Sequence, residues 1–173
     1  MSLFLSKPIT LVALAFPLLL SGGRPHATEI SGTISNTLTI YDDSELVGDV
    51  TCTVAGGPCI QFGASDIKLR LNGHTITEET TGCTPDTSSQ DGIDVAATGL
   101  HDVAILGPGL VQKFGGFGIG ILGVSKVKVE GVTTSDNCFS GIFLGSTNDS
   151  DIERNVSVRN SIESFAHAPC GGT

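Results

Sequence analysis

Residues 118–155 read GIGILGVSKVKVEGVTTSDNCFSGIFLGSTNDSDIERN, and this stretch decides the fold. Two short apolar runs begin at Ile119 and Ile142, each directly after a glycine and 23 positions apart. A second apolar run follows each of them, at Val127 and at Ile152. Apolar residues that alternate with others and are bounded by Gly, Asn, Asp and Ser are typical of strands joined by turns. The stretch therefore predicts a unit of two strands that occurs twice.

The same unit extends upstream through most of the chain. The first runs begin 33, 26 and 23 positions apart, at Ile60, Ile93, Ile119 and Ile142. Residues 77–91 account for the longest interval and predict a projecting surface loop. A sandwich would repeat a hairpin, whereas two strands that recur in one order about every 23–26 residues indicate a solenoid. With a less regular unit at residues 38–52, we expect about five stacked coils.

Stacking of the coils would pair equivalent strands in parallel and align their side chains in ladders. Three apolar ladders are expected inside the stack: Ile60, Ile93, Ile119 and Ile142; Phe62, Val95, Ile121 and Leu144; and Ile67, Val103, Val127 and Ile152. Residues of the opposite parity should point outward. Asp94, for example, should face solvent with Gln61, Gly120 and Phe143 as its neighbours in adjacent coils.

The second runs share features at both ends. They follow Asp66, Asp102, Lys126 and Asp151, which we expect to align at a turn. They close at Gly73, Gly107, Gly131 and Asn155, where a sharp corner favours residues that tolerate a positive φ. The fourth coil departs from the pattern, because Arg154 would be costly inside an apolar tube. Its strand is therefore expected to end there and to resume at residues 156–158.

The first residues predict a secretory signal peptide, residues 1–27. Lys7 is followed by an apolar run at residues 9–20 and then by Ser21-Gly22-Gly23, which is the layout of such a signal. Cleavage after Gly23 and cleavage after Ala27 both fit. The apolar run is too short to span a bilayer comfortably. We therefore expect a single β-helix domain at residues 28–173, extracellular or periplasmic, and not membrane-spanning after signal removal.

Charge and cysteine content narrow the partners and the compartment. The formal net charge of −9 argues against a nucleic-acid partner, because phosphate recognition begins with a basic surface. Five cysteines fit an oxidising compartment. Cys52 and Cys59 bracket a loop that turns sharply enough for a disulfide. The pairing of Cys83, Cys138 and Cys170 stays open, with one cysteine left unpaired within a single chain.

Two segments resemble a known family. Residues 65–77, SDIKLRLNGHTIT, and residues 141–155, GIFLGSTNDSDIERN, resemble the repeats of exported parallel β-helix proteins of the pectate-lyase-like superfamily, similar to NosD-type proteins. The resemblance covers residues 34–165. It implies an all-β fold, a right-handed parallel β-helix solenoid. Members of the superfamily include lyases, hydrolases, epimerases and surface proteins, so the resemblance implies no single activity.

Several residues could carry chemistry on the outside of such a stack. Asp94 is the candidate for acid hydrolysis, but no second acid joins it on its expected ladder. Outward lysines, Lys68, Lys126 and Lys128, could support β-elimination. His74 is expected to be a corner residue, and the sequence adjacency of His101 and Asp102 does not place their side chains together. The aromatics could either stack on sugar rings or pack loops onto the tube: Phe114, Phe117, Phe139, Phe143 and Phe165.

The sequence supports two functions. The first is a secreted glycan-binding or cell-surface module, because the repeat is regular and the catalytic segments of the superfamily are not found. The alternative is a polysaccharide lyase, glycoside hydrolase or uronate epimerase whose active residues lie in missing coils. No cofactor is evident, and Ca²⁺ is implied only by family analogy. The chain is expected to be incomplete at its C-terminus and to self-associate edge to edge there.

Overall fold

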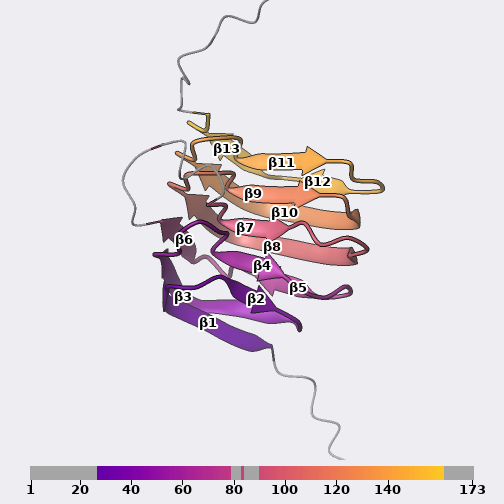
Figure 1. Ribbon diagram of the computed structural model, residues 1–173, viewed down its shortest axis with the longest axis horizontal. Helices are drawn as coiled ribbons and strands as arrows, with labels where there is room; N and C mark the ends of the chain where they lie inside the picture. Colours follow the sequence, from indigo (N-terminus) through magenta and orange to yellow (C-terminus); the bar gives the residue numbers. More distant parts are fainter. Residues whose placement is uncertain (1–26, 79–82, 84–89, 162–173) are drawn as a thin grey trace, which may run out of the picture.

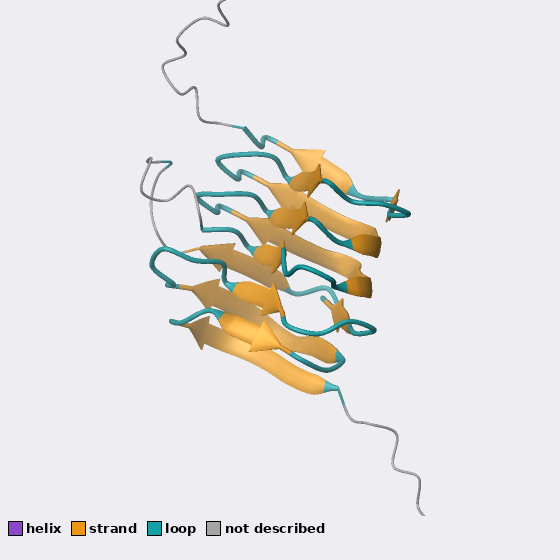
Figure 2. Cartoon of the chain, turned by 45° about the vertical axis from the view of Figure 1, so that its right-hand side comes forward, coloured by secondary structure: helices purple, strands orange, loops and turns teal. Residues whose placement is uncertain are grey.

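The computed structural model describes residues 27–78, 83 and 90–161 of the chain. The segment predicted to be a signal peptide, apart from its last residue, and the tail predicted to leave the C-terminal coil open lie outside these residues. Every regular element that is described is a β-strand, and no helix occurs among them (Figure 2). Accordingly, the described part of the chain contains no helix of the length and apolarity needed to cross a membrane.

The strands form two parallel sheets, and the chain visits the sheets in alternation (Figure 1). The larger sheet consists of β1 (Thr28–Ile34), β3 (Ser44–Cys52), β5 (Lys68–Arg70), β6 (Thr75–Glu78), β8 (His101–Gln112), β10 (Ser125–Ser135), β12 (Asp151–Glu153) and β13 (Val156–Val158). The smaller sheet consists of β2 (Leu38–Ile40), β4 (Ile60–Phe62), β7 (Ile93–Val95), β9 (Ile119–Leu122) and β11 (Ile142–Gly145). Successive repeats therefore lie on top of one another, from indigo to yellow in Figure 1.

The pairing register confirms the ladder that runs through the smaller sheet. Ile60 pairs with Ile93, Ile93 with Ile119, and Ile119 with Ile142. Ile60, Ile93 and Ile119 are completely buried between the sheets, as expected for aliphatic side chains stacked in a core. In the second ladder Val95, Ile121 and Leu144 pair in that order, and Val95 and Ile121 are buried. The prediction is wrong for Leu144, which is 39% exposed, because β11 is the last strand of the smaller sheet among the described residues. The inward positions of β4, β7 and β9 are as predicted.

The third ladder is wrong in its last member. Val103 and Val127 pair as predicted, but Ile152 pairs with Val129, two positions further along β10. Asp151 consequently faces Lys128 and does not align with Asp66 and Asp102. The physical reason is that the last two repeats keep one 23-residue register, from Ser125 opposite Asn148 to Thr133 opposite Val156. A strand cannot slip by two residues without an insertion, and none separates the first and second runs of this repeat.

The corners were predicted only in part. Gly73 and Gly131 have positive φ angles of 86° and 69°, as expected for sharp corners. Gly107 has another role, because a Cβ atom there would lie 1.9 Å from the carbonyl oxygen of Gly131 in the next repeat. In the last repeat Arg154, with a φ of 54°, makes the corner in place of Asn155. Its guanidinium points outward to Glu130, which avoids the buried charge.

Asn155 instead completes the hydrogen bonding of the larger sheet. Its side-chain oxygen accepts from the backbone N–H of Val132 at 2.8 Å, and its amide donates to the carbonyl of Val129 at 2.8 Å. These two groups flank the position where β10 shifts register between Glu130 and Val132. The side chain thus satisfies backbone groups that the irregular ladder leaves unpaired.

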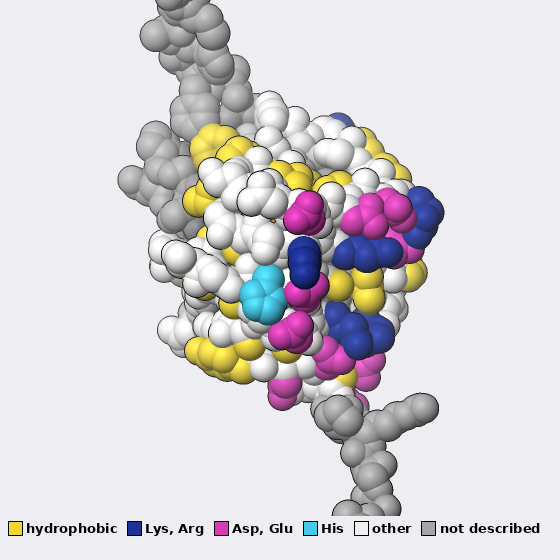
Figure 3. Space-filling view, turned by 90° about the vertical axis from the view of Figure 1, so that its right-hand side faces the viewer, with side chains coloured by type: hydrophobic (Ala, Val, Ile, Leu, Met, Phe, Trp, Pro, Cys, Tyr) yellow, Lys and Arg dark blue, Asp and Glu magenta, His cyan; other side chains and the backbone are white. Residues whose placement is uncertain are grey.

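Another corner carries the residues before the second runs. Asp66, Asp102 and Lys126 all have positive φ angles, between 53° and 61°. In the last repeat the corresponding turn residue is Asp149, with a φ of 53°, and not Asp151. This corner is the charged edge of the molecule, where acidic and basic side chains gather (Figure 3).

Two disulfides are present. Cys52 and Cys59 are bonded, with Cα atoms 5.8 Å apart. Cys83 and Cys138 form the second bond, with Cα atoms 5.5 Å apart and 55 positions between them in sequence. This pairing resolves two of the three cysteines that the sequence left open, and Cys170 lies outside the described residues. Disulfides are typical of oxidising compartments, which fits an exported protein.

Candidate functional site

The outer surface of the smaller sheet carries a column of side chains from successive strands. Strand alternation turns Gln61, Asp94, Gly120 and Phe143 outward, and their pairing places them side by side from β4 to β11. The amide of Gln61 donates a hydrogen bond to Asp94 at 3.2 Å. This column was predicted from the sequence with the correct members and order.

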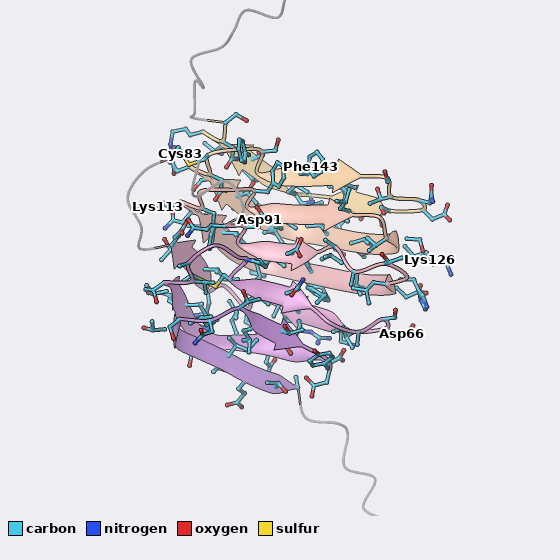
Figure 4. All side chains as sticks on the ribbon, in the orientation of Figure 1. Asp66, Cys83, Asp91, Lys113, Lys126 and Phe143 are labelled. Atoms are coloured by element: carbon cyan, nitrogen blue, oxygen red, sulfur yellow. A yellow bond between two sulfur atoms is a disulfide. The ribbon has the colours of Figure 1, made fainter. Side chains whose placement is uncertain are left out.

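Asp91 joins this column from the residues that precede β7 (Figure 4). Its Oδ1 accepts a hydrogen bond of 2.6 Å from the backbone N–H of Phe117. Its Oδ2 lies over β9, where a Cβ atom added to Gly120 would be only 2.9 Å away. Gly120 therefore leaves the space that the carboxylate occupies. A second acid thus stands beside Asp94, although the sequence assigned Asp91 to a surface loop.

A signal for Asp91 is present in the sequence. The segment Asp91-Gly92-Ile93-Asp94 repeats as Phe117-Gly118-Ile119-Gly120, so Asp91 and Phe117 hold the same position before the glycine. The backbone pairing of Gly92 with Phe117 and of Ile93 with Gly118 confirms the equivalence. Alignment of the residue before each glycine would therefore have placed Asp91 on the outer surface.

The two carboxyl groups hold protons more readily than acids in water. Burial raises the pKa of Asp91 to about 6, and the neighbouring charge of Asp94 adds to this, while the N–H of Phe117 acts in the opposite direction. Burial also raises the pKa of Asp94, and the amide of Gln61 offsets part of that rise. No positive group of the described residues contributes to either pKa, so the pair is an acidic site.

Three phenylalanines lie next to the acids. The rings of Phe117 and Phe143 stack with centroids 4.5 Å apart and an interplanar angle of 8°. Phe139 tilts against Phe117 at 46°, with centroids 5.5 Å apart. All three are half-buried and so keep part of their surface toward solvent. Phe114, in contrast, is buried in the core and cannot contact a ligand, and Phe165 lies outside the described residues.

We call Gln61, Asp91, Asp94, Phe117 and Phe143 the acid–aromatic face. It combines an apolar ring stack with two carboxylates and an amide, all on rigid strands or directly beside them. Ligand sites are commonly built in this way, from aromatic surface with a few placed polar groups. The acids and the amide can accept hydrogen bonds from hydroxyl or amino groups of a ligand. A flat apolar surface of the same ligand can pack against the rings.

The charged corner brings together Asp66 and Asp102, which the sequence aligned at a turn, and His101. Sequence adjacency alone left the relation of the His101 and Asp102 side chains open, and the structure places His101 Nδ1 3.0 Å from Asp102 Oδ2. A ligand atom of Asp66 lies within 4.8 Å of both. All three residues are exposed, and Lys126 Nζ is 3.6 Å from Asp102. Ca²⁺ prefers six or more oxygen ligands. A histidine, two exposed acids and a neighbouring ammonium group do not fit this ion.

The lysines proposed for β-elimination are engaged with acids. Lys68 Nζ is 2.9 Å from Asp43, and Lys128 Nζ is 2.8 Å from Glu130. For Asp43, burial is outweighed by the hydrogen bonds and charge of Lys68, so its pKa is lowered. The described residues therefore do not assemble these lysines into a uronate-binding groove. His74 lies at the corner as predicted, 3.5 Å from Asp49.

One further hollow lies on the larger sheet, between Leu106, Gly107, Pro108, Glu130, Gly131 and Arg154. Its charged members pair with each other, which leaves the acid–aromatic face as the better-founded site among the described residues. That conclusion rests on the geometry of the chain itself. No family model, no curated protein and no solved structure matches this chain.

Proposed function

We propose that this chain is a secreted right-handed parallel β-helix that binds glycans on its acid–aromatic face. The parallel two-sheet stack, the repeat resemblance and the two disulfides support the β-helix and the oxidising compartment. The single observation that carries the function is the parallel-stacked Phe117–Phe143 pair directly beside Asp91 and Asp94. Extracellular or periplasmic location follows from the N-terminal signal pattern.

Each part of the face has a role in this proposal. The ring stack offers a flat apolar surface for the C–H face of a pyranose ring. Asp91, Asp94 and the carbonyl of Gln61 accept hydrogen bonds from sugar hydroxyl groups. Gly120 leaves room for the Asp91 carboxylate next to the Phe117 ring, which brings an acid and the ring stack together for one sugar to contact. Because the strands hold these groups at fixed spacing, little ordering accompanies binding.

The test is binding of defined oligosaccharides to the purified protein by calorimetry. We expect Phe143→Ala to weaken binding by about twofold to tenfold, since the loss of a stacked ring costs about 0.5–1.5 kcal/mol. Lys128→Ala, on the larger sheet, is the matched control and should bind as the parent does. Unchanged binding by folded Phe143→Ala, or no glycan binding by the parent, would overturn the proposal.

A second candidate function is glycoside hydrolysis at the same face. The observation that favours it is the raised pKa of Asp91, about 6, which suits a general acid, with Asp94 as the second carboxylate. Release of reducing ends from an oligosaccharide, abolished in Asp91→Asn, would establish this activity. Binding without release of reducing ends would leave the protein a glycan-binding module. The lyase and epimerase alternatives have less support, because the lysines considered for that chemistry, Lys68, Lys126 and Lys128, are paired with acids.

A further inference from the structure

We infer that the glycan selected by the acid–aromatic face carries free, protonated amino groups, as a glucosamine-containing polymer does. The inference rests on the proposed glycan-binding function and names its substrate class. It follows from how the described residues distribute charge between the two sheets.

Positive side chains are absent from the strands of the smaller sheet. The sequences of these strands are LTI, IQF, IDV, IGIL and IFLG. Every lysine and arginine that the structure describes lies on the larger sheet or in a turn: Lys68, Arg70, Lys113, Lys126, Lys128, Arg154 and Arg159. Residues 79–90, which lead to Asp91, contain no Lys, Arg or His either. Among the described residues, a ligand on this face therefore meets acids and no lysine or arginine of the same strands.

Some acids elsewhere in the described chain have positive partners, whereas others, such as Glu78 with the N–H of Gly115, accept from neutral groups. Asp43 pairs with Lys68 at 2.9 Å, and Asp136 accepts hydrogen bonds of 2.7 and 2.8 Å from Arg159. Asp91 and Asp94 instead receive hydrogen bonds from neutral amides, those of Phe117 and Gln61. Among the charged groups of the described residues, the one that acts on the Asp91 pKa is Asp94, another acid. Within the part of the chain that the structure describes, Asp91 and Asp94 thus have no positive partner, and a ligand can supply that charge.

An ammonium group on a sugar supplies that charge. Hydrogen bonds between a charged donor and a carboxylate are about twice as strong as neutral ones. The faces of Phe117 and Phe143 also attract cations, by about 0.5–1 kcal/mol at exposed positions. A uronate, in contrast, would bring a third carboxylate to two that already repel each other. N-acetylation of the amine would remove the charge and leave the ring contact unchanged.

The experiment compares short oligosaccharides of equal length by calorimetry at about pH 6.5, where most of Asp91 is ionised. The probes are a glucosamine oligomer, its fully N-acetylated form and an oligogalacturonate. We expect the free amine to bind about tenfold or more tightly than the N-acetylated form, and the uronate to bind least. In Asp91→Asn/Asp94→Asn, the preference for the amine should fall to about onefold to twofold.

The control variant is Asp102→Asn, which removes an exposed acid at the charged corner and should keep the preference. Circular dichroism and the N-acetylated probe show that each variant is folded and competent. Equal affinity of the parent for the two glucosamine forms would refute the inference while the glycan-binding function stands. If the double variant keeps the preference for the free amine, that preference comes from the overall negative charge of the protein. This result would also refute the inference. Failure of all three probes to bind would refute this inference and contradict the proposed function.

Discussion

Asp91 shows how one residue can be both costly to the fold and useful to a site. The fold holds its carboxyl group half-buried beside a second acid, and its pKa is raised from 3.8 to about 6. The folded chain therefore binds a proton more tightly than the unfolded chain does. Stability contributed by the protonated form is present at low pH and is lost as the pH rises from about 4 to about 7.

Asp91→Asn should remove this pH dependence. The amide oxygen can still accept the hydrogen bond from Phe117, but no charge is buried above the pKa. We expect the free energy of unfolding to exceed that of the parent on the order of 1–3 kcal/mol near pH 8, and to match it near pH 4. Urea unfolding across this pH range measures the difference. A constant difference at all pH values would contradict the assignment of the shift to burial.

Asp136→Asn is the control with the opposite sign. The hydrogen bonds and charge of Arg159 lower the pKa of Asp136, so its ionised form stabilises the fold above about pH 4 and loses this effect as the pH falls. Removing the charge should therefore lower stability toward neutral pH rather than raise it. The two variants should diverge as the pH increases.

The sequence predicted the position of Asp94 but not that of Asp91. The alternation within Ile93-Asp94-Val95 was enough to place Asp94 outward and to name its column. Asp91 follows Thr-Ser-Ser-Gln and precedes a glycine, which reads locally as a loop. Its role depends on Gly120 and Phe117, which lie more than twenty positions away and approach only when repeats stack. A local pattern cannot report that contact.

At the scale of the element, the isoleucine ladder was the most predictable part of the molecule. Three of its four isoleucines follow a glycine and Ile60 follows Cys59, so the register could be read from the sequence without knowledge of the turns. The register of β12 was not found because Ser150, not an apolar residue, stands opposite Val127. The prediction matched Ile152 with Val127 because both are apolar. The backbone instead keeps the constant 23-residue spacing, which pairs Ile152 with Val129.

The ladder makes a direct prediction for Ile119. Its side chain is fully buried between Ile93 and Ile142, so Ile119→Asp would bury an unpaired charge and should prevent cooperative folding or cost more than about 4 kcal/mol. Lys128→Ala, at an outward position of β10 in the larger sheet, should change stability by less than about 1 kcal/mol, since it loses only surface ion pairs, those with Glu130 and Asp151. Thermal unfolding compares them, and equal melting temperatures would contradict the register.

The turn after β10 depends on a pair of asparagines. Asn137 is fully buried, accepts from the N–H of Phe114 at 3.0 Å and donates to the carbonyl of Val111 at 3.3 Å. Its amide and backbone N–H groups also donate to Asn160 Oδ1, at 2.8 and 3.1 Å. These bonds satisfy backbone groups that no strand partner reaches. The pair therefore links three consecutive repeats at one corner.

Asn137→Ala should be among the most destabilising polar substitutions in the chain. It leaves the buried N–H of Phe114 without its partner, which costs about 1–3 kcal/mol, and it removes further bonds to Asn160. Asn148→Ala, at an exposed turn, is the control and should change stability by less than about 0.5 kcal/mol. Chemical unfolding of both variants gives the comparison. A loss for Asn137→Ala no larger than that for the control would show that water replaces the network.

At the scale of the whole molecule, the two sheets have different chemistry on their outer surfaces. The larger sheet and its corners carry the lysines and arginines, paired with acids such as Glu130 and Asp136. The smaller sheet carries the acid–aromatic face without a cation. The sequence predicted the stack that separates these surfaces, but not the separation itself, because charged residues of both kinds are scattered along the chain. Only the assignment of each strand to a sheet reveals it.

The disulfides act on the whole molecule by limiting the unfolded chain. In the chain-entropy description, the 55-residue separation of Cys83 and Cys138 corresponds to about 4 kcal/mol, and the 7-residue separation of Cys52 and Cys59 to about 2 kcal/mol. Direct comparison of alanine variants would be distorted, because Cys52 and Cys59 are both buried and their truncation also leaves cavities.

A cleaner design keeps one disulfide at a time and reduces it. Cys52→Ala/Cys59→Ala retains the long-range bond, Cys83→Ala/Cys138→Ala retains the short one, and Cys170→Ser in both excludes exchange. For each variant, the free energy of unfolding is measured in oxidised and reduced form, so that the folded side chains are the same in both. We expect the oxidised-minus-reduced difference to be larger for the Cys83–Cys138 bond, by about 2 kcal/mol. The reverse order would mean that the unfolded chain keeps residues 83 and 138 near each other without the bond, so that closing the long loop costs little entropy.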